Sequence, residues 1–363
     1  MQFLKANTGS TQGTNWWKEI NIKDALVQNY DVAISGGIKD LAYRTSFSYM
    51  DQEGIIAGSD YDRISWRTNF NHNLRDWLTL SGNFGLINEG RGNVLEGSPG
   101  FNTAFIAFVA DPISQVYRNN LTDIPDFLRD GLFLDRIDPN NPWSMYSPIL
   151  MTNKENPVAQ TDIYKNNRWK GTAIKAGGAV DIKLTPWLKY RSSLGIDISN
   201  GISNSFLPQY YLNGNQFNND ATVGASNSSS KYYVWENTLT YEKEIDDHKV
   251  SMMVGTSAEQ WKNESSAASR QGLVSNDPSQ WIIDAGAINP QASGTKWESA
   301  LNSYFGRAFY SYKNRYMVTA NLRYDGSSNF GEGEKWGLFP SLSAGWNFSQ
   351  EAFMEDATWL DAG

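Results

Sequence analysis

The chain of 363 residues has no cysteine and only two histidines. Without cysteine there can be no disulfide framework, thiolate metal site or cysteine nucleophile. Imidazole could come only from His72 and His248, so a multi-histidine metal centre is not expected. The longest uninterrupted apolar run covers residues 104–110, whereas a membrane-spanning helix needs roughly 20 residues. The sequence therefore excludes a helical membrane protein.

Positive charge is also scarce. The 31 Lys and Arg residues are outnumbered by 39 Asp and Glu residues, which gives a net charge of -8, and no basic cluster marks a nucleic-acid partner. The first residues lack the basic and apolar segments of a signal peptide. Aromatic residues are abundant in contrast: 17 Phe, 18 Tyr and 14 Trp stand in a chain that is only 40% hydrophobic. Because disordered chains are poor in aromatic residues, we expect a folded protein.

Alternation with a period of two residues is the strongest structural signal. In residues 42–49, large side chains such as Tyr43 and Phe47 alternate with small or polar ones, which predicts a strand. The same pattern is strong at 63–70, 78–86, 187–199 and 316–325, and weaker at 30–35, 172–184, 233–241, 250–258, 304–312 and 338–348. We therefore expect about eleven strands. Pro340 counts against the last one, because proline removes a hydrogen-bond donor.

The connections between these segments are short and long in turn. The short ones lie at 36–40, 75–76, 185–186, 242–247 and 313–314, and the long ones at 51–60, 88–166, 200–231, 263–297 and 326–336. Antiparallel strands with tight turns at one end and long loops at the other are typical of an outer-membrane barrel, whose strands need roughly 9 to 11 residues to cross. A soluble sheet with one polar face is the alternative.

The charged residues favour the barrel. Arg44, Arg67 and Arg191 fall on the strand faces opposite the apolar ones, and a basic residue facing lipid at the midplane would cost roughly 2 to 4 kcal/mol. Tyr43 and Tyr49 lie near opposite ends of one strand, as the aromatic belts at the membrane interfaces require. We predict an all-β fold: a partial transmembrane, antiparallel, up-and-down β-barrel of outer-membrane type with long extracellular loops.

Two groups of motifs resemble the SusC/RagA family of TonB-linked outer-membrane transporters from Bacteroidetes. The first group comprises residues 17–20, 28–37, 43–48, 51–55 and 59–63, and the second comprises residues 303–307, 310–313, 323–331, 336–341 and 344–346. Both groups stand in the order of the family, and the alternating pattern joins them, so the resemblance covers nearly the whole chain. It implies a barrel of about 22 strands, of which this chain would hold about half.

The resemblance implies that residues 1–363 are a partial TonB-dependent receptor barrel domain, without the signal peptide, the amino-terminal extension, the plug and the last strands. The whole protein would lie in the cell outer membrane, in contact with the lipid bilayer. It would import oligosaccharides or peptides with a SusD-like surface lipoprotein, driven by the TonB-ExbB-ExbD complex through the missing amino-terminal part. A non-transporting structural or adhesive barrel, and a receptor of the siderophore or cobalamin type, remain alternatives. No cofactor is implied.

Aromatic residues in the expected extracellular loops are the candidate ligand-binding residues: Trp143, Tyr146, Tyr210, Tyr211, Trp281 and Trp297. Rings beside amide and carboxylate side chains suit sugars or peptides, because the ring stacks while the polar groups form hydrogen bonds. The alternative is that these rings pack the loops against each other. The apolar segment 101–110 is expected to be a short buried helix rather than a docking surface.

Catalytic and metal sites have little support in the sequence. Oxygen-bearing side chains gather between residues 135 and 141, but their spacing fits turns better than a calcium loop. His72 and His248 stand beside tight turns and are expected at the periplasmic rim. An enzyme at the barrel mouth could use a carboxylate pair such as Asp60 and Asp62, but we expect no enzyme and no metal.

Overall fold

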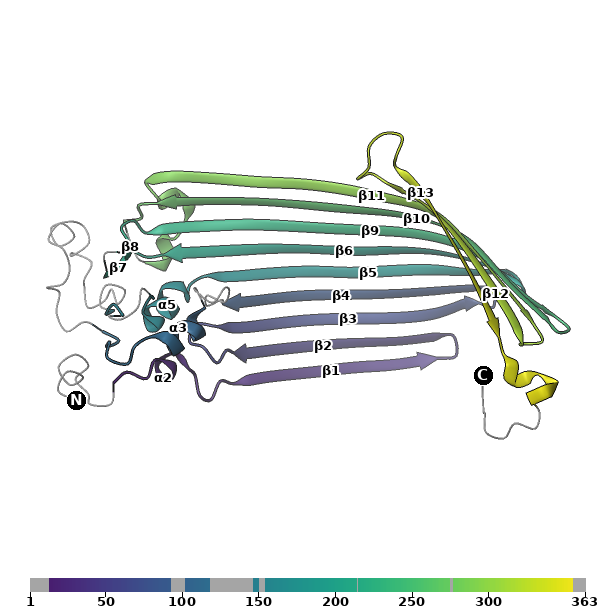
Figure 1. Cartoon of the computed structure of the whole chain (residues 1–363), viewed down its shortest axis with the longest axis horizontal. Coiled ribbons are helices and arrows are strands. Elements are labelled where there is room, and N and C mark those ends of the chain that lie inside the picture. Colours follow the sequence, from purple (N-terminus) through teal and green to yellow (C-terminus); the bar gives the residue numbers. More distant parts are fainter. Residues whose placement is uncertain are drawn as a thin grey trace.

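The structure is a computed structural model that describes residues 13–92, 102–117, 146–149, 154–213, 215–274 and 277–354. In these residues eleven strands form one antiparallel sheet, and they follow each other across the sheet in chain order, as expected for an up-and-down barrel wall (Figure 1). Trp143 and the segment 135–141 lie outside the described residues. No helix of the described part is long and apolar enough to cross a membrane.

The strands of the sheet are β1 (Val27–Ile38), β2 (Leu41–Glu53), β3 (Asp60–Arg75), β4 (Leu78–Gly92), β5 (Arg168–Thr185), β6 (Leu188–Leu207), β9 (Thr222–Ile245), β10 (His248–Gln271), β11 (Ile288–Tyr312), β12 (Tyr316–Ser327) and β13 (Trp336–Trp346). A separate hairpin consists of β7 (Tyr210–Asn213) and β8 (Gln216–Asn218). The helices are the short α2 (Trp16–Ile20), α3 (Thr103–Val109) and α5 (Pro157–Tyr164). Single 3-10 turns are η2 (Pro278–Gln280), η3 (Ile283–Ala285), η4 (Phe348–Gln350) and η5 (Ala352–Met354).

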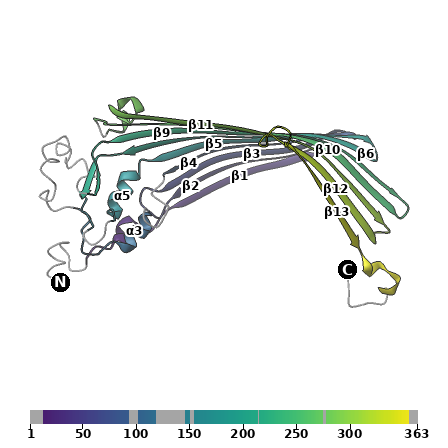
Figure 2. The same cartoon turned by 45° about the horizontal axis from the view of Figure 1, so that its top comes forward.

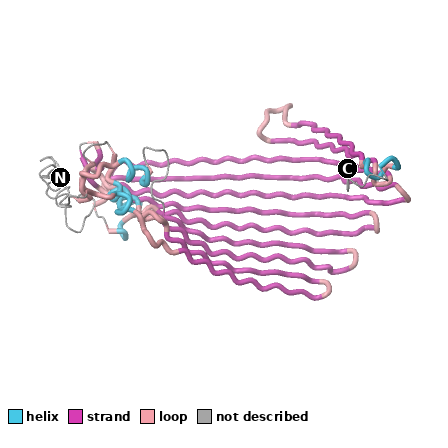
Figure 3. Tube along the Cα trace, turned by 60° about the horizontal axis from the view of Figure 1, so that its bottom comes forward, coloured by secondary structure: helices cyan, strands magenta, loops and turns pink. Residues whose placement is uncertain are grey.

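The sheet is a single curved layer that does not close. Figure 2 shows its curvature, with β12 and β13 turned sharply away from the other strands. Figure 3 shows its two ends: tight turns join strands at one end, and the helices and longer loops gather at the other, which we call the loop end. Within the described residues, β1 and β13 each have a neighbour on one side only. The sheet therefore forms part of a barrel wall.

The tight turns fall where the sequence predicts them. The turn from β9 to β10 passes through Asp246 at a φ of 50°, and the turn from β11 to β12 passes through Lys313 and Asn314, each at 54°. Aspartate and asparagine adopt this left-handed conformation more readily than most residues. His72 lies opposite Leu41 near the same end, and His248 begins β10 there. Both histidines are thus at the rim with the tight turns.

The two faces of the sheet differ in chemistry. Directly paired residues share a face, and one row that crosses five strands in register consists of Phe47, Trp66, Leu86, Ile174 and Ile198. We call this side the apolar face and the opposite side the polar face. Phe47 and Trp66 are 50% and 45% exposed, because no second layer covers them. A soluble sandwich would bury these side chains, so the structure favours the membrane barrel.

Two of the expected loops, at 200–231 and 263–297, are mostly strand. β6 continues to Leu207, β9 already begins at Thr222, β10 continues to Gln271, and β11 begins at Ile288. β9 and β10 have 24 residues each and β11 has 25, more than the roughly 9 to 11 that cross a bilayer. The additional residues are mostly small or polar on both faces. They therefore carry no hydrophobic alternation from which a strand could be predicted.

Pro340 does not prevent the last strand, β13. It pairs in register with Leu322 of β12, and β13 has no second neighbour among the described residues. Eleven residue pairs join the two strands, from Tyr316 opposite Trp346 to Gly326 opposite Trp336. The last expected strand is therefore confirmed, with Pro340 inside it.

Candidate functional site

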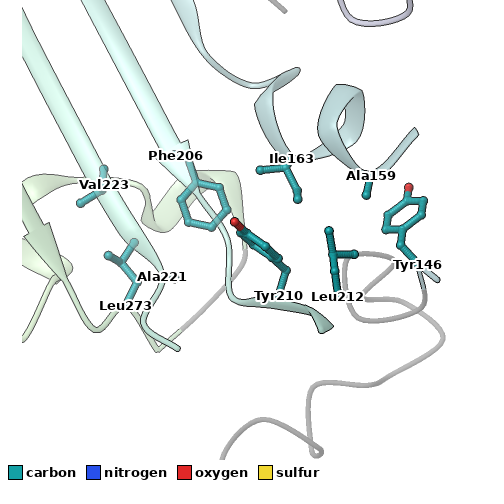
Figure 4. Close-up of a cluster of buried hydrophobic side chains, with 9 residues drawn as sticks. All are labelled: Tyr146, Ala159, Ile163, Phe206, Tyr210, Leu212, Ala221, Val223 and Leu273. Atoms are coloured by element: carbon teal, nitrogen blue, oxygen red, sulfur yellow. The ribbon is translucent and has the colours of Figure 1, made fainter. Parts of the chain in front are cut away.

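The loops at the loop end pack around a hydrophobic cluster. Phe206 and Leu212 are each 1% exposed, and Trp281 stacks on Phe206 with 3.9 Å between ring centroids and 10° between ring planes. Figure 4 shows the cluster, which consists of Tyr146, Ala159, Ile163, Phe206, Tyr210, Leu212, Ala221, Val223 and Leu273. The cluster joins α5 to the ends of β6, β9 and β10, so it fixes these loops relative to the sheet.

Asn156 ties the same layer together through four hydrogen bonds. Its side-chain oxygen caps α5 by accepting from the backbone N–H groups of Val158 and Ala159, at 3.0 and 3.2 Å. Its amide nitrogen donates to the carbonyl oxygens of Val116 and Ser147, at 2.9 and 3.0 Å. A capping side chain that also reaches two other loops stabilises the helix start and the loop positions at once.

Glu155 adds a titratable group to this layer. Its carboxylate accepts a hydrogen bond from Gln160 at 3.2 Å, and the Gln160 side-chain oxygen accepts one from Thr103 at 2.6 Å. Burial raises the pKa of Glu155 above its usual value, and the Gln160 hydrogen bond offsets that shift only in part. Burial, and then the charge of Glu155, also raise the pKa of Tyr210. The layer is therefore most stable when Glu155 is protonated.

Three of the sequence-predicted ligand residues, Tyr146, Tyr210 and Trp281, belong to this layer, and Tyr211 is buried beside it in β7. Tyr146, Tyr210 and Tyr211 are 3%, 8% and 6% exposed, and the Tyr146 hydroxyl donates to Asp162 at 2.9 Å. Trp281 is half-buried, with one face of its ring stacked on Phe206. A buried ring leaves no face free for a sugar or a peptide, so the three tyrosines pack loop against loop in this conformation. A direct role in ligand binding stays a prediction for them, as it does for Trp143.

Trp297 is in a strand and not, as expected, in a loop. It lies in β11 opposite Asn263 of β10, and its exposure of 50% leaves the ring accessible. Asn263 pairs in turn with Ser230 of β9, and this row belongs to the polar face. The reason is the length of β10 and β11, which extend beyond the segment in which hydrophobic alternation marks them.

Trp297 belongs to a group of aromatic residues on the polar face that we call the lumen platform: Trp169, Tyr232, Trp261 and Trp297. Tyr232 pairs in register with Asp197 on one side and Trp261 on the other. The rings of Tyr232 and Trp261 stack with 5.1 Å between centroids, and the Tyr232 hydroxyl donates to Glu259 at 2.9 Å. These contacts hold two of the four rings in fixed orientations.

Trp169 lies over two glycines of the sheet. A Cβ atom at Gly171 would stand 2.2 Å from the indole Cη2, and one at Gly201 would stand 2.8 Å from the indole Nε1. The Arg91 guanidinium lies 4.8 Å from the ring centroid, a favourable cation-π distance. Any side chain at either glycine would displace the ring, so the position of Trp169 depends on both.

A shallow cavity of about 260 Å³ reaches from Trp169 to Trp297. Hydroxyl, amide and carboxylate groups line it between the two indoles, among them those of Glu89, Ser199, Ser230, Asn263 and Thr295. Such a cavity can bind a polar ligand with a flat face, because the indoles stack while the floor forms hydrogen bonds. Among the described residues, no group of His, Asp or Glu is arranged to hold a metal ion.

Sequence reasoning missed three of the four platform residues. Trp169, Tyr232 and Trp261 are not in the long loops on which the search for aromatic residues concentrated. They could have been found from the alternation within each strand, because residues an odd number of positions apart lie on opposite faces. In β9, for example, Trp235 marks the apolar face, because it pairs with Leu194, so Tyr232 must stand on the opposite side. An aromatic residue on the polar face of a barrel strand points to the barrel interior.

Curated relatives match almost the whole chain, although no family model matches it. The TonB-dependent receptor SusC of Bacteroides thetaiotaomicron is 29% identical over 98% of this chain and 34% of its own length. The TonB-dependent receptor P39 of Formosa agariphila is 27% identical over 99% of this chain and 33% of its own length. The chain thus spans about a third of the length of the curated relatives it matches.

Solved structures share the fold. The RagAB peptide importer in the 'open-open' state superposes with a TM-score of 0.74 and 18% identity, over 95% of this chain and 36% of that chain. The FpvAI-pyocin S2 complex superposes with a TM-score of 0.52 and 12% identity, over 89% of this chain and 40% of that chain. At these identities the likeness concerns the fold alone, which is that of an outer-membrane barrel wall.

Proposed function

We propose that this chain builds one side of an import channel for oligosaccharides, as part of an outer-membrane β-barrel like those of the TonB-dependent receptors that it resembles. The polar face lines the channel, the apolar face contacts lipid, and the loop end faces the outside of the cell. The lumen platform holds the ligand near the channel mouth. This segment binds and guides its ligand, and it carries no catalytic step.

The charges of the polar face support the channel. Lys175 pairs with Asp197 at 2.6 Å, and Arg191 pairs with Asp181 at 2.7 Å. Ion pairs of this kind are tolerated in a water-filled channel, whereas charges facing lipid are costly. The same strands present Ile174, among other apolar residues, on their opposite face. The wall is therefore amphipathic, with its charged groups on the face that lines the proposed channel and its apolar groups on the face toward lipid.

The lumen platform is the observation that supports oligosaccharides as the ligand class. A pyranose ring has an apolar face that stacks on indole and a rim of hydroxyl groups. Trp169 and Trp297 supply two indoles, and Ser199, Ser230 and Asn263 supply hydrogen-bonding groups between them. Peptides are the second candidate class, because the RagAB peptide importer shares this fold and an extended peptide could also hydrogen-bond to the floor.

Two partners complete the proposal. A SusD-like surface lipoprotein would deliver the ligand at the loop end, where the hydrophobic cluster holds the loops in place. The TonB-ExbB-ExbD complex would supply the work through a part of the receptor outside these residues. The family likeness to SusC and RagAB supports both partners.

The test replaces the two indoles that border the cavity. In the whole receptor, Trp169→Ala and Trp297→Ala should each weaken saccharide binding about fivefold to tenfold, the loss expected for one ring stack. Phe309→Ala is the matched control, because Phe309 lies on the same face of β11 near the end with the tight turns. Binding to saccharide and peptide panels is measured by calorimetry, together with uptake by cells. Unchanged binding in both tryptophan variants would contradict the proposed site.

A further inference from the structure

A cluster of lysines lies on the outward side of the long strands, the side that carries the apolar face. On β9, Lys231 stands two residues from Tyr233, at the point where the apolar segment of this face ends. Lys231 pairs in register with Lys262 of β10. Lys296 of β11 lies one row further, opposite Glu264. The three lysines therefore form a basic patch immediately beyond the membrane-spanning band.

The charges in this patch are not balanced within the described residues. Lys296 lies 3.0 Å from Glu264 and 3.8 Å from Glu298, and Lys262 lies 3.8 Å from Glu298. Lys231 forms no ion pair with any described residue, and it stands directly opposite Lys262. Like charges in directly opposed positions destabilise a sheet. An anion placed between Lys231 and Lys262 would remove this repulsion.

A shallow cavity of about 670 Å³ adjoins the patch on the side away from the membrane band. Its lining includes the amide groups of Asn200 and Asn227, the hydroxyl groups of Ser229 and Ser266, the side chain of Ile202, and the ion pair of Lys296 with Glu264. Amide, hydroxyl and ammonium groups together match a ligand that combines sugar hydroxyl groups with phosphate. The cavity is on the outer surface of the wall, so a ligand in the channel would not reach it.

We propose that this patch binds the phosphorylated saccharide headgroup of a lipid in the outer leaflet. The position of the patch indicates this occupant. The patch lies on the surface that faces lipid and begins where the apolar band ends, so it is at the level of the lipid headgroups. Basic residues beside a membrane attract anionic headgroups. The phosphate lies between Lys231 and Lys262, and the saccharide occupies the adjoining cavity. This inference rests on the orientation given in the proposed function, with the loop end outside the cell.

The experiment measures lipid retention by the whole receptor in nanodiscs doped with lipid A. Native mass spectrometry counts bound diphosphorylated lipid A in the wild type and in the double variant Lys231→Gln/Lys262→Gln. Each basic residue beside a membrane contributes about 1 kcal/mol to the binding of anionic lipid, so the loss of both lysines should weaken lipid A binding roughly thirtyfold. The control is Lys243→Gln, because Lys243 lies on the same face of β9 at the opposite end; this variant should retain lipid A as the wild type does.

Two further measurements make the outcome decisive. Dephosphorylated lipid A should bind the wild type as weakly as lipid A binds the double variant, and excess inorganic phosphate should not displace the lipid. Equal retention of lipid A by wild type and double variant, or displacement by inorganic phosphate alone, would overturn the proposal. Heat-modifiable migration and ligand uptake are recorded for each variant, so that a misfolded barrel or a failure of the import function is recognised separately.

Discussion

Two neighbouring residues of β6, Ser193 and Leu194, allow a direct test of which face meets lipid. Leu194 is 49% exposed and pairs with Trp235 on the apolar face, whereas Ser193 pairs with Glu236 on the polar face. An arginine facing lipid near the midplane costs roughly 2 to 4 kcal/mol. Leu194→Arg should therefore shift the folding equilibrium roughly 30-fold to 1,000-fold toward the unfolded state, whereas Ser193→Arg should shift it by much less.

The assay is urea unfolding of the whole receptor in lipid vesicles, followed by the difference in gel migration between folded and unfolded barrel. The two variants introduce the same side chain one position apart, so intrinsic strand propensity and net charge are matched. Equal destabilisation by both variants would refute the assignment of the faces, and so would a larger cost for Ser193→Arg. The channel and the lipid-headgroup site both depend on this assignment.

Two other predictions concern the platform and the loops. Gly171→Val should displace Trp169, because a Cβ there would stand 2.2 Å from the ring; saccharide affinity should fall to the level of Trp169→Ala while the barrel still folds, and wild-type affinity would show that the ring position does not matter. Glu155→Gln should stabilise the loop layer at neutral pH, because burial raises the pKa of Glu155 above its usual 4.5, so wild-type stability falls as pH rises from 4.5 through the raised pKa. Limited proteolysis of the loops across this range should show protection falling with pH in the wild type and staying constant in the variant; parallel profiles would contradict the assignment.

The sheet is predictable from the sequence where one face is apolar. Phe47 and Trp66 alternate with polar neighbours and lie in register on the same face, so alternation locates their strands and their orientation. The extensions of β9, β10 and β11 escape such reasoning, because serine, asparagine and alanine on both faces leave no period to detect. Pro340 misleads for another reason: proline removes one N–H group, yet the strand around it still pairs with β12 in register over its whole length.

The binding site is less predictable than the fold. The search for ligand residues chose aromatic residues in long polar segments, and three of these, Tyr146, Tyr210 and Tyr211, are buried. Burial of a loop ring depends on contacts between segments far apart in the chain, which a single sequence does not reveal. Parity within β5 would place Trp169 on the polar face, but that Gly171 and Gly201 lie beneath its ring follows only from the structure.

In the proposed channel, the length of β9, β10 and β11 sets how far from the lipid surface a ligand is first met. β10 continues for roughly a dozen residues past the apolar band, and at about 3.4 Å per residue this corresponds to about 40 Å of strand. Because each strand in this region is hydrogen-bonded to its neighbours, the tips cannot swing as free loops would. Adding two residues to each strand would raise the tips without exchanging the faces, so reach outside the cell can change while the channel wall stays the same.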